Sequence, residues 1–384
     1  MTADNPVFAV AALALFLGCS WAMLRLSNME LPKGRLTSID GLRGFLAASV
    51  FIHHSLIWRG YVLTGVWQAP DSNFYNQLGQ SSVGLFFMIT GFLFTRRLLE
   101  GNVDWLRLYA GRFARLTPLY LVALALMLTL VAWRSGFTLR QPAALVLGQS
   151  LRWLTFGFLT PPINGLEETG LITAYVTWTL PWEWKFYLLL PLVAFALRRS
   201  HSRPVVWLAG LVVVLLLIFA PTPRLFLGGV LAAFLVRDAR WLAFAPTRRA
   251  ALAAIACLLA ALLLFHSAFR LPPLIFLTAF FAIVAGGNTL FGVLAWRPSR
   301  LLGEISFSVY LLHGLLLFAL FRLILPAPQA LSDTQHWLVA GGAIPLLVVV
   351  CLTTFRWVES PGVRRTKALH EWAMKSFPFL RAGA

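Results

Sequence analysis

The chain has 384 residues, of which 59% are hydrophobic, 14% aromatic and only 12% charged, and its mean hydropathy is +0.78. A soluble domain carries about 25% charged residues, so this chain has too few polar side chains to cover a surface that faces water. The composition excludes an ordinary soluble globular protein. It predicts an all-α integral membrane protein, in which lipid covers much of the surface.

The net charge of +18 comes from 32 Lys and Arg against 14 Asp and Glu. The basic residues form short clusters between apolar runs, for example at 96–97, 198–199 and 364–367. This pattern is typical of the cytoplasmic loops of membrane proteins, so we expect no nucleic-acid partner. The three cysteines are scattered through apolar runs and predict neither a disulfide framework nor a metal site: Cys19, Cys257 and Cys351.

Apolar runs long enough to cross a bilayer lie at about 6–25, 44–63, 81–99, 116–133, 183–198, 204–221, 224–237, 250–268, 272–292, 301–325 and 337–357. A further stretch, 143–160, is interrupted by Arg152 and followed by Pro161-Pro162. If it does not cross, and 135–182 stays on the outer side, 24 of the 32 Lys and Arg fall in inner loops. The positive-inside rule therefore predicts about 11 transmembrane helices, with the N-terminus outside and the C-terminus inside. Segment 143–160 would then be re-entrant or lie along the interface.

The first chemically distinctive segment, Ser38 to Gly44, enters the run that carries His53-His54. Asp40 lies at the expected helix start, where an N-cap is its simplest role. Arg43 and His54 are eleven residues apart, which puts them near one helix face and roughly 16 Å apart along the axis. Histidine is suited to take a proton near neutral pH, although a structural hydrogen bond inside the bundle is the alternative.

Three further segments carry ionisable groups close to or within spans, where such groups are costly. Arg112 and Arg115 share a helix face and could clamp phosphates, or could be positive-inside anchors. In the outer aromatic belt that includes Trp178, Glu183 could cap a helix, orient His54 or bind an acceptor hydroxyl. Glu304 and His313 could form a structural hydrogen-bond network or take part in catalysis.

Six motifs occur in order: SIDGLRG followed by HH, SSVGLFFMITGFLFTRR, GRFARLTPLYLV, WTLPWEWKFYLLLPLV, LGEISFSVYLLHG and WVESP. Together they resemble the membrane-bound acyltransferase-3 family, which includes O-antigen and exopolysaccharide O-acetyltransferases and macrolide acyltransferases. The resemblance runs from about Ser38 to Pro361. It implies an acyltransferase membrane domain over 36–361 with a core of about ten helices. The charge count adds one extra transmembrane helix within 1–30, which departs from the simplest pattern of the family. Residues 362–384 would form a basic cytoplasmic tail.

The resemblance also implies the site. The family's arginine–ten residues–histidine motif maps onto Arg43 and His54, its RxxR motif onto Arg112 and Arg115, and its tryptophan-to-glutamate stretch onto Trp178 and Glu183. The expected donor is acetyl-CoA or another acyl-CoA, bound by Arg112 and Arg115, with His54, Arg43 and Glu183 as catalytic residues and no metal. The acceptor would be a hydroxyl of a carbohydrate or similar compound.

The expected location is the bacterial inner membrane, with a cytoplasmic C-terminus and the lipid bilayer as surroundings. Many relatives carry a C-terminal hydrolase-like domain of the SGNH type, whereas this sequence ends soon after Pro361. Either the membrane domain completes transfer alone, or a separate periplasmic transferase does so. The same buried His, Glu and Arg groups could instead serve a proton-coupled transporter or a flippase of lipid-linked glycans. A non-catalytic scaffold is a third alternative.

Overall fold

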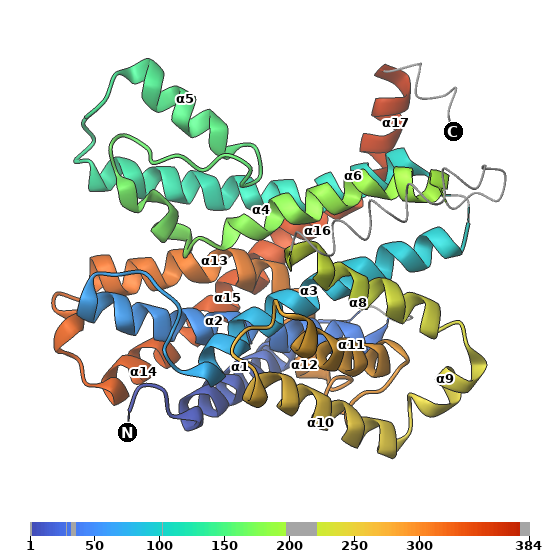
Figure 1. The fold of residues 1–384 in the computed structure, drawn as a ribbon. Coiled ribbons are helices and arrows are strands. Elements are labelled where there is room, and N and C mark those ends of the chain that lie inside the picture. The colour runs from blue at the N-terminus through green and yellow to red at the C-terminus, as the bar shows by residue number, and fades with distance from the viewer. Residues whose placement is uncertain (1, 28, 32–35, 102, 197–220, 377–384) are drawn as a thin grey trace.

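The computed structural model describes residues 2–27, 29–31, 36–101, 103–196 and 221–376 (Figure 1). All regular elements in these ranges are helical, and the predicted run 204–221 lies almost wholly outside them. The longer helices are α1 (Pro6–Ser27), α2 (Thr37–Thr64), α3 (Asn73–Leu99), α4 (Trp105–Arg134), α5 (Ala143–Trp153), α6 (Leu180–Ala196), α8 (Pro221–Leu235), α10 (Arg248–Leu264), α11 (Leu271–Ala285), α13 (Ser306–Ala319), α14 (Asp333–Gly342), α15 (Ile344–Thr354) and α17 (Thr366–Ser376).

The shorter elements are the 3₁₀ helices η1 (Glu167–Thr173), η2 (Val176–Thr179) and η4 (Pro328–Ala330), the π-helical turns η3 (Leu320–Ile324) and η5 (Phe355–Glu359), and the short helices α9 (Ala239–Phe244), α12 (Arg297–Glu304) and α16 (Ser360–Arg364). Two predicted spans are interrupted. Run 301–325 divides among α12, α13 and η3, and run 337–357 divides among α14, α15 and η5.

Five stretches of the described chain are helical, long and apolar enough to cross a membrane: Pro6–Ser27, Asn73–Leu99, Trp105–Arg134, Ser306–Ile324 and Asp333–Ser376. The chain is therefore a multi-pass, all-helical membrane protein. Helix α5 has only 11 residues, about 16 Å of helix, which is roughly half the thickness of the hydrocarbon core. It is too short to cross alone, in line with the sequence argument for segment 143–160.

Local sequence explains where several helices begin and end. Asp104 caps α4 by accepting a hydrogen bond from the backbone N–H of Arg107, and Ser332 forms a capping box with Gln335 at α14. Gly65 ends α2 with a φ of +73°, which glycine adopts without steric cost. The expectation that Asp40 caps α2 is wrong, because the helix begins at Thr37. Asp40 lies in the first turn, where its negative charge is favourably placed with respect to the helix dipole.

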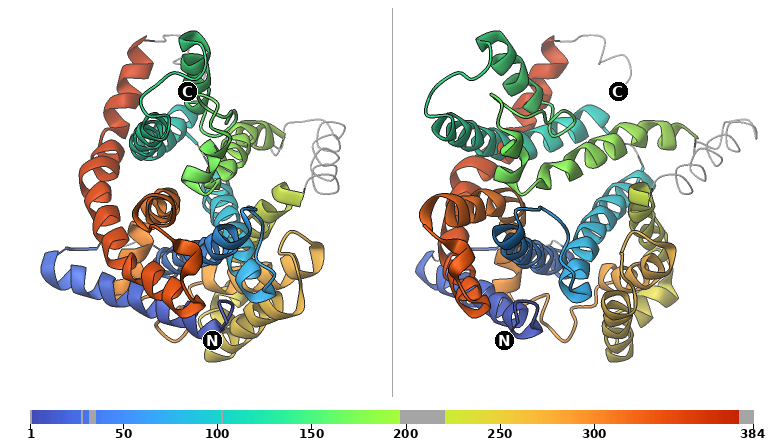
Figure 2. Two further views of the ribbon diagram at one scale, coloured as in Figure 1. Left: turned by 90° about the vertical axis from the view of Figure 1, so that its left-hand side faces the viewer. Right: turned by 60° about the vertical axis from the view of Figure 1, so that its left-hand side comes forward.

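Helices α2, α3 and α13 lie together in the middle of the molecule, and α4 and α6 pass across them on the side that is uppermost in Figure 1. Helices α8, α10 and α11 pack against α3. Helix α1 runs along α12 and α15 (Figure 2). The predicted N-terminal helix is thus packed against the bundle rather than separate from it.

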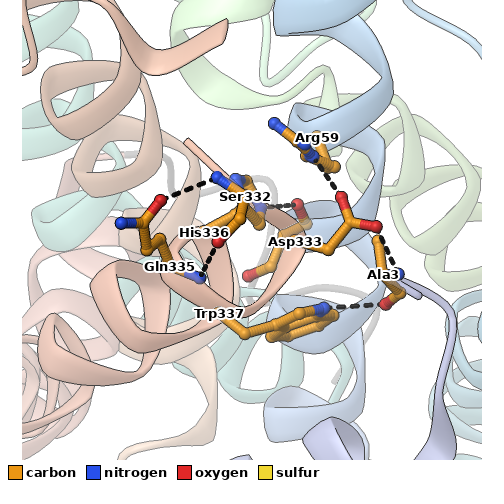
Figure 3. A network of polar contacts seen from close by, with 8 residues as sticks. Ala3, Arg59, Ser332, Asp333, Gln335, His336 and Trp337 are labelled. Atoms are coloured by element: carbon orange, nitrogen blue, oxygen red, sulfur yellow. Dashed lines mark hydrogen bonds and ion pairs between the residues drawn. The ribbon is translucent and has the colours of Figure 1, made fainter. Parts of the chain in front are cut away.

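The start of the chain is tied to α2 and α14 by a polar network (Figure 3). Asp333 accepts hydrogen bonds from the Arg59 guanidinium at 2.8 Å and from the Ala3 backbone N–H at 3.0 Å. The Trp337 indole donates to the Ala3 carbonyl at 2.7 Å. These contacts hold the beginning of the chain against the bundle and give the buried Arg59 side chain a counter-charge.

Helices α2 and α12 approach so closely that their contact requires glycine. A Cβ atom at Gly303 would lie 1.8 Å from the Asp40 carbonyl oxygen, and one at Gly44 would lie 2.8 Å from that of Ser299. Small residues allow this kind of close helix contact in membrane proteins.

We expect Gly303→Ala to lower the free energy of unfolding by about 1–3 kcal/mol or more, because the added methyl group must push α12 away from α2. Thermal unfolding of the purified protein in detergent measures the loss. The matched control is Gly18→Ala on α1, where no atom lies within 4 Å of the added Cβ and the midpoint should not fall. Equal midpoints for Gly303→Ala and wild type would contradict the close contact.

Candidate active site

A cavity of about 120 Å³ is enclosed by side chains of α2, α3, α4, α6 and α13. Its charged lining consists of Arg43 from α2, Arg112 and Arg115 from α4, and Glu183 from α6. Sites for drug-sized ligands measure about 300–1,000 Å³, so this cavity accommodates one part of such a ligand. Three arginines against one glutamate leave an excess of positive charge, and guanidinium groups pair well with phosphate or carboxylate.

The helical period explains how α4 contributes two arginines. Arg112 and Arg115 are three residues apart and therefore lie on one face, which here is the face toward the cavity. The Arg112 guanidinium carbon also lies 5.2 Å from the centre of the Phe94 ring, within range of a cation–π contact. The arginines that the sequence analysis singled out on two separate helices thus converge on one space.

Two buried carboxylates provide counter-charge to these arginines. The charges of Glu304 and Glu359 act on both Arg43 and Arg115. Glu359 is only 2% exposed and accepts a hydrogen bond from the Ser308 hydroxyl. Glu359 is the third residue of the WVESP motif, and no role was predicted for it from the sequence. A glutamate at the end of an apolar run was the available signal, because such groups are rarely placed there without a partner.

The beginning of α13 forms another part of the cavity wall. Helical geometry is interrupted at Ile305, so a new helix starts at Ser306, and both Ser306 and Tyr310 line the cavity. The Ser306 hydroxyl is fully buried, and among the described residues it has no hydrogen-bond partner. Buried hydroxyls are normally satisfied, and helix N-termini attract anions. This end of the cavity is therefore suited to a polar or anionic ligand group.

His54 lies further along α2 and contacts a second histidine. Its Nδ1 is 3.1 Å from the Val50 carbonyl oxygen and 3.0 Å from Nε2 of His313. His313 is fully buried, and its own Nδ1 is 3.0 Å from the Val309 carbonyl oxygen. A carbonyl oxygen only accepts, so this network assigns the proton to Nδ1 in both neutral rings, and the one Nδ1–H of His54 is shared between the Val50 carbonyl and Nε2 of His313. Nε2 of His54 is then left with a free lone pair, as a general base requires.

Aromatic rings lie on another side of His54. The Trp67 ring stacks on the imidazole, with centroids 6.1 Å apart and planes 17° apart. Tyr175, which is 43% exposed, contacts Trp67 at 5.9 Å. Tyr61 also contacts Trp67, and its hydroxyl donates to Glu168, which forms an ion pair with Arg322 at 2.9 Å. Ring contacts flanked by polar groups therefore connect the exposed Tyr175 to His54 through Trp67.

The structure separates the predicted site residues into two groups. Arg43, Arg112, Arg115 and Glu183 line the cavity, whereas His54 lies beside His313. Helix α13 connects the groups, because Tyr310 lines the cavity and its ring contacts that of His313 at 6.2 Å. Glu183 accepts a hydrogen bond from the Tyr187 hydroxyl at 2.8 Å, whereas the side chain hydrogen-bonded to the His54 imidazole is that of His313.

Trp178 lies apart from both groups. Trp178, predicted in the aromatic belt, is 40% exposed and contacts Phe87 and Phe269. Among the described residues, no group of three or more His, Cys, Asp or Glu side chains could hold a metal ion.

Comparison with known proteins gives a consistent family. The protein-family model described as an acyltransferase domain matches residues 36–356. The chain is 24% identical over 365 residues to BcsY of Komagataeibacter xylinus, a protein named as a proposed membrane-bound transacylase, covering 88% of this chain and 86% of the relative. It is 29% identical over 185 residues to the acyltransferase MdmB of Streptomyces mycarofaciens, covering 46% and 43%.

It is also 27% identical over 193 residues to O-acetyltransferase OatA of Staphylococcus aureus, covering 47% of this chain and 28% of the relative. The match thus spans less than a third of the length of OatA. No solved structure matches the chain.

Proposed function

This chain belongs to the acyltransferase family whose model matches residues 36–356, and on that premise we propose that it transfers an acyl group from a cytoplasmic acyl-CoA to a hydroxyl of a cell-envelope or exported carbohydrate. Acetyl is the proposed acyl group. Membership of the family makes the protein an acyltransferase rather than the transporter or scaffold that the sequence alone left open. The donor, the acceptor and the membrane sides are parts of this proposal.

The observation that carries the proposal is the convergence of three arginines on a cavity that α13 connects to a histidine with a free lone pair. Coenzyme A carries phosphate groups on a long, narrow pantetheine arm. Arg112, Arg115 and Arg43 would bind the phosphates, and the unpaired hydroxyl of Ser306 is a further donor to an anionic oxygen. The small cavity volume fits a part of the donor rather than the whole molecule.

In the proposed reaction, Nε2 of His54 removes the proton from the acceptor hydroxyl as its oxygen attacks the thioester carbonyl. The carbon–sulfur bond breaks, an ester forms, and the departing thiolate takes a proton back from His54. The alternative is a two-step route, in which His54 first accepts the acyl group and then passes it to the acceptor hydroxyl. Glu183 would position the acceptor rather than His54. Its carboxylate lines the cavity and accepts a hydrogen bond from Tyr187, whereas the imidazole of His54 is hydrogen-bonded to His313.

The proposed acceptor is a carbohydrate, because the approach to His54 combines aromatic faces with charged groups. The C–H faces of sugar rings pack on aromatic rings, and their hydroxyls hydrogen-bond to carboxylate and guanidinium groups. Trp67 and Tyr175 supply the first kind of contact, and Glu168 and Arg322 supply the second.

We expect Trp67→Ala to raise KM for the acceptor about tenfold while KM for the thioester stays unchanged, because one stacking surface is lost. Steady-state transfer to a fixed glycan acceptor measures both constants. Trp133→Ala, which removes a half-exposed tryptophan of α4, is the control and should leave both constants unchanged. A larger change in the thioester KM than in the acceptor KM would contradict this assignment.

The proposed topology is a ten-helix core plus α1, in the bacterial inner membrane with the C-terminus in the cytoplasm. The short α5 supports the outer placement of 135–182. Arg96 in the last turn of α3 and Arg115 in the first half of α4 support an inner placement of the donor cavity. A basic cytoplasmic tail over 362–384 is part of the proposal, and completion of the transfer by a separate periplasmic transferase is the alternative to transfer by the membrane domain alone.

The proposal is tested by incubating purified protein with labelled acetyl-CoA and a panel of cell-envelope glycans. Mass spectrometry should find an alkali-labile ester on at least one glycan, formed in step with free CoA. Release of CoA without any acylated product would contradict transfer to a hydroxyl.

A further inference from the structure

The two histidines come from helices that are far apart in the sequence, and each makes contacts that fix its ring. His54 of α2 and His313 of α13 meet at 3.0 Å, with ring centroids 5.0 Å apart. Backbone carbonyls one helical turn earlier, those of Val50 and Val309, hold Nδ1 of each ring. The His313 side chain is fully buried, with an exposed fraction of 0%. A buried side chain with both nitrogens engaged is held in one orientation.

The direction of these hydrogen bonds matters for proton transfer. Nδ1–H of His313 donates to Val309, so its Nε2 lone pair faces Nδ1–H of His54. When Nε2 of His54 takes up a proton, the ring becomes an imidazolium whose Nδ1–H is a stronger donor. The lone pair of His313 is already aligned to accept it. A carboxylate has this function in the Ser-His-Asp triad, where it orients the histidine and stabilises the imidazolium.

On the basis of this geometry, and resting on the proposed function, we propose that His313 is the positioning residue of His54, orienting its Nε2 toward the reacting atoms and stabilising the imidazolium through Nδ1. No covalent bond to His313 forms or breaks. The acceptor proton moves to Nε2 of His54 and then to the departing thiolate, while the Nδ1 proton stays between the two rings.

Neighbouring groups are consistent with a neutral pair. In the part of the chain that the structure describes, the other aromatic rings in contact with these two are those of His53, Trp67 and Tyr310. His53 is engaged elsewhere, because its Nδ1 lies 2.9 Å from the Tyr75 carbonyl oxygen. Glu183 forms its hydrogen bond with Tyr187. His313 is thus the recorded side-chain hydrogen-bond partner of His54.

The test compares two substitutions of nearly equal length and volume. In His313→Gln, the amide oxygen can accept the hydrogen bond from Nδ1–H of His54. In His313→Met, a thioether fills the same space but is only a weak acceptor. We expect His313→Met to lower kcat about 100-fold with KM values for donor and acceptor changed less than about twofold. His313→Gln should recover at least a tenth of the wild-type kcat.

Thermal unfolding midpoints of both variants establish whether they are folded, and kcat is compared at matched folded fraction. Equal losses of kcat in the two variants would overturn the proposal, because they would assign His313 a packing role only. Full activity of His313→Met would also overturn it. In either case the wild-type reaction still stands, whereas an inactive wild type contradicts the proposed function and the histidine pair together.

Discussion

Replacing His54 with alanine is expected to lower the rate of acyl transfer by about 10²–10⁴-fold, the usual contribution of a general base. The expected loss falls on kcat, because His54 lies outside the charged cavity and removes no donor contact. Its Nε2 carries a free lone pair, since Nδ1 is engaged by Val50 and His313. The measurement is the initial rate of CoA release at saturating donor and acceptor.

The matched control for this prediction is the adjacent histidine. His53→Asn keeps a side-chain N–H that can donate to the Tyr75 carbonyl, and it should retain most of the activity. Both variants must insert and show wild-type unfolding midpoints. If His54→Ala transfers acyl groups at a rate near that of wild type, or if His53→Asn loses as much activity, His54 is not the base.

Replacing Arg115 with alanine is expected to raise KM for acetyl-CoA by roughly 10–100-fold, because a charge-assisted hydrogen bond to phosphate contributes about 1.5–3 kcal/mol. Arg115 lines the cavity together with Arg43 and Arg112, where the donor phosphates would bind. The sharper measurement uses a second donor, a short acetyl thioester without phosphate groups. Its KM should be the same for Arg115→Ala and wild type.

Arg97→Ala, which removes an exposed arginine at the end of α3, provides the control for net charge and should leave both KM values unchanged. A similar rise in KM for the phosphate-free thioester would mean that Arg115 acts on the thioester or on the fold. The arginines would then not be a phosphate clamp.

The sequence predicted those features of the site that depend on one helix at a time. Composition indicated the membrane, and spacing predicted that Arg112 and Arg115 share a face. It also placed Arg43 and His54 on the same helix, α2. These relations follow from the fixed geometry of an α-helix, so they needed no information about packing.

The features that depend on contacts between helices were not predictable in the same way. His54 and His313 are 259 positions apart, and nothing in either helix specifies which face meets which. The same holds for Glu359 and its hydrogen bond to Ser308. The interruption at Ile305 lies inside an apolar run without a proline, so hydropathy alone predicted one continuous span. The prediction of about 11 crossings stays a prediction.

Acyl transfer from acetyl-CoA to a glycan, with His54 as the base and Arg115 as a donor-binding residue, is best tested with purified protein in liposomes. The liposomes are supplied with radiolabelled acetyl-CoA and a glycan acceptor. Wild type, His54→Ala and Arg115→Ala are compared for consumption of the thioester and for label on the glycan. We expect wild type to move label onto the glycan, His54→Ala to move none, and Arg115→Ala to do so only at raised donor concentration. Proton-coupled flux of a glycan across the membrane, with no thioester consumed by any of the three proteins, would contradict this expectation.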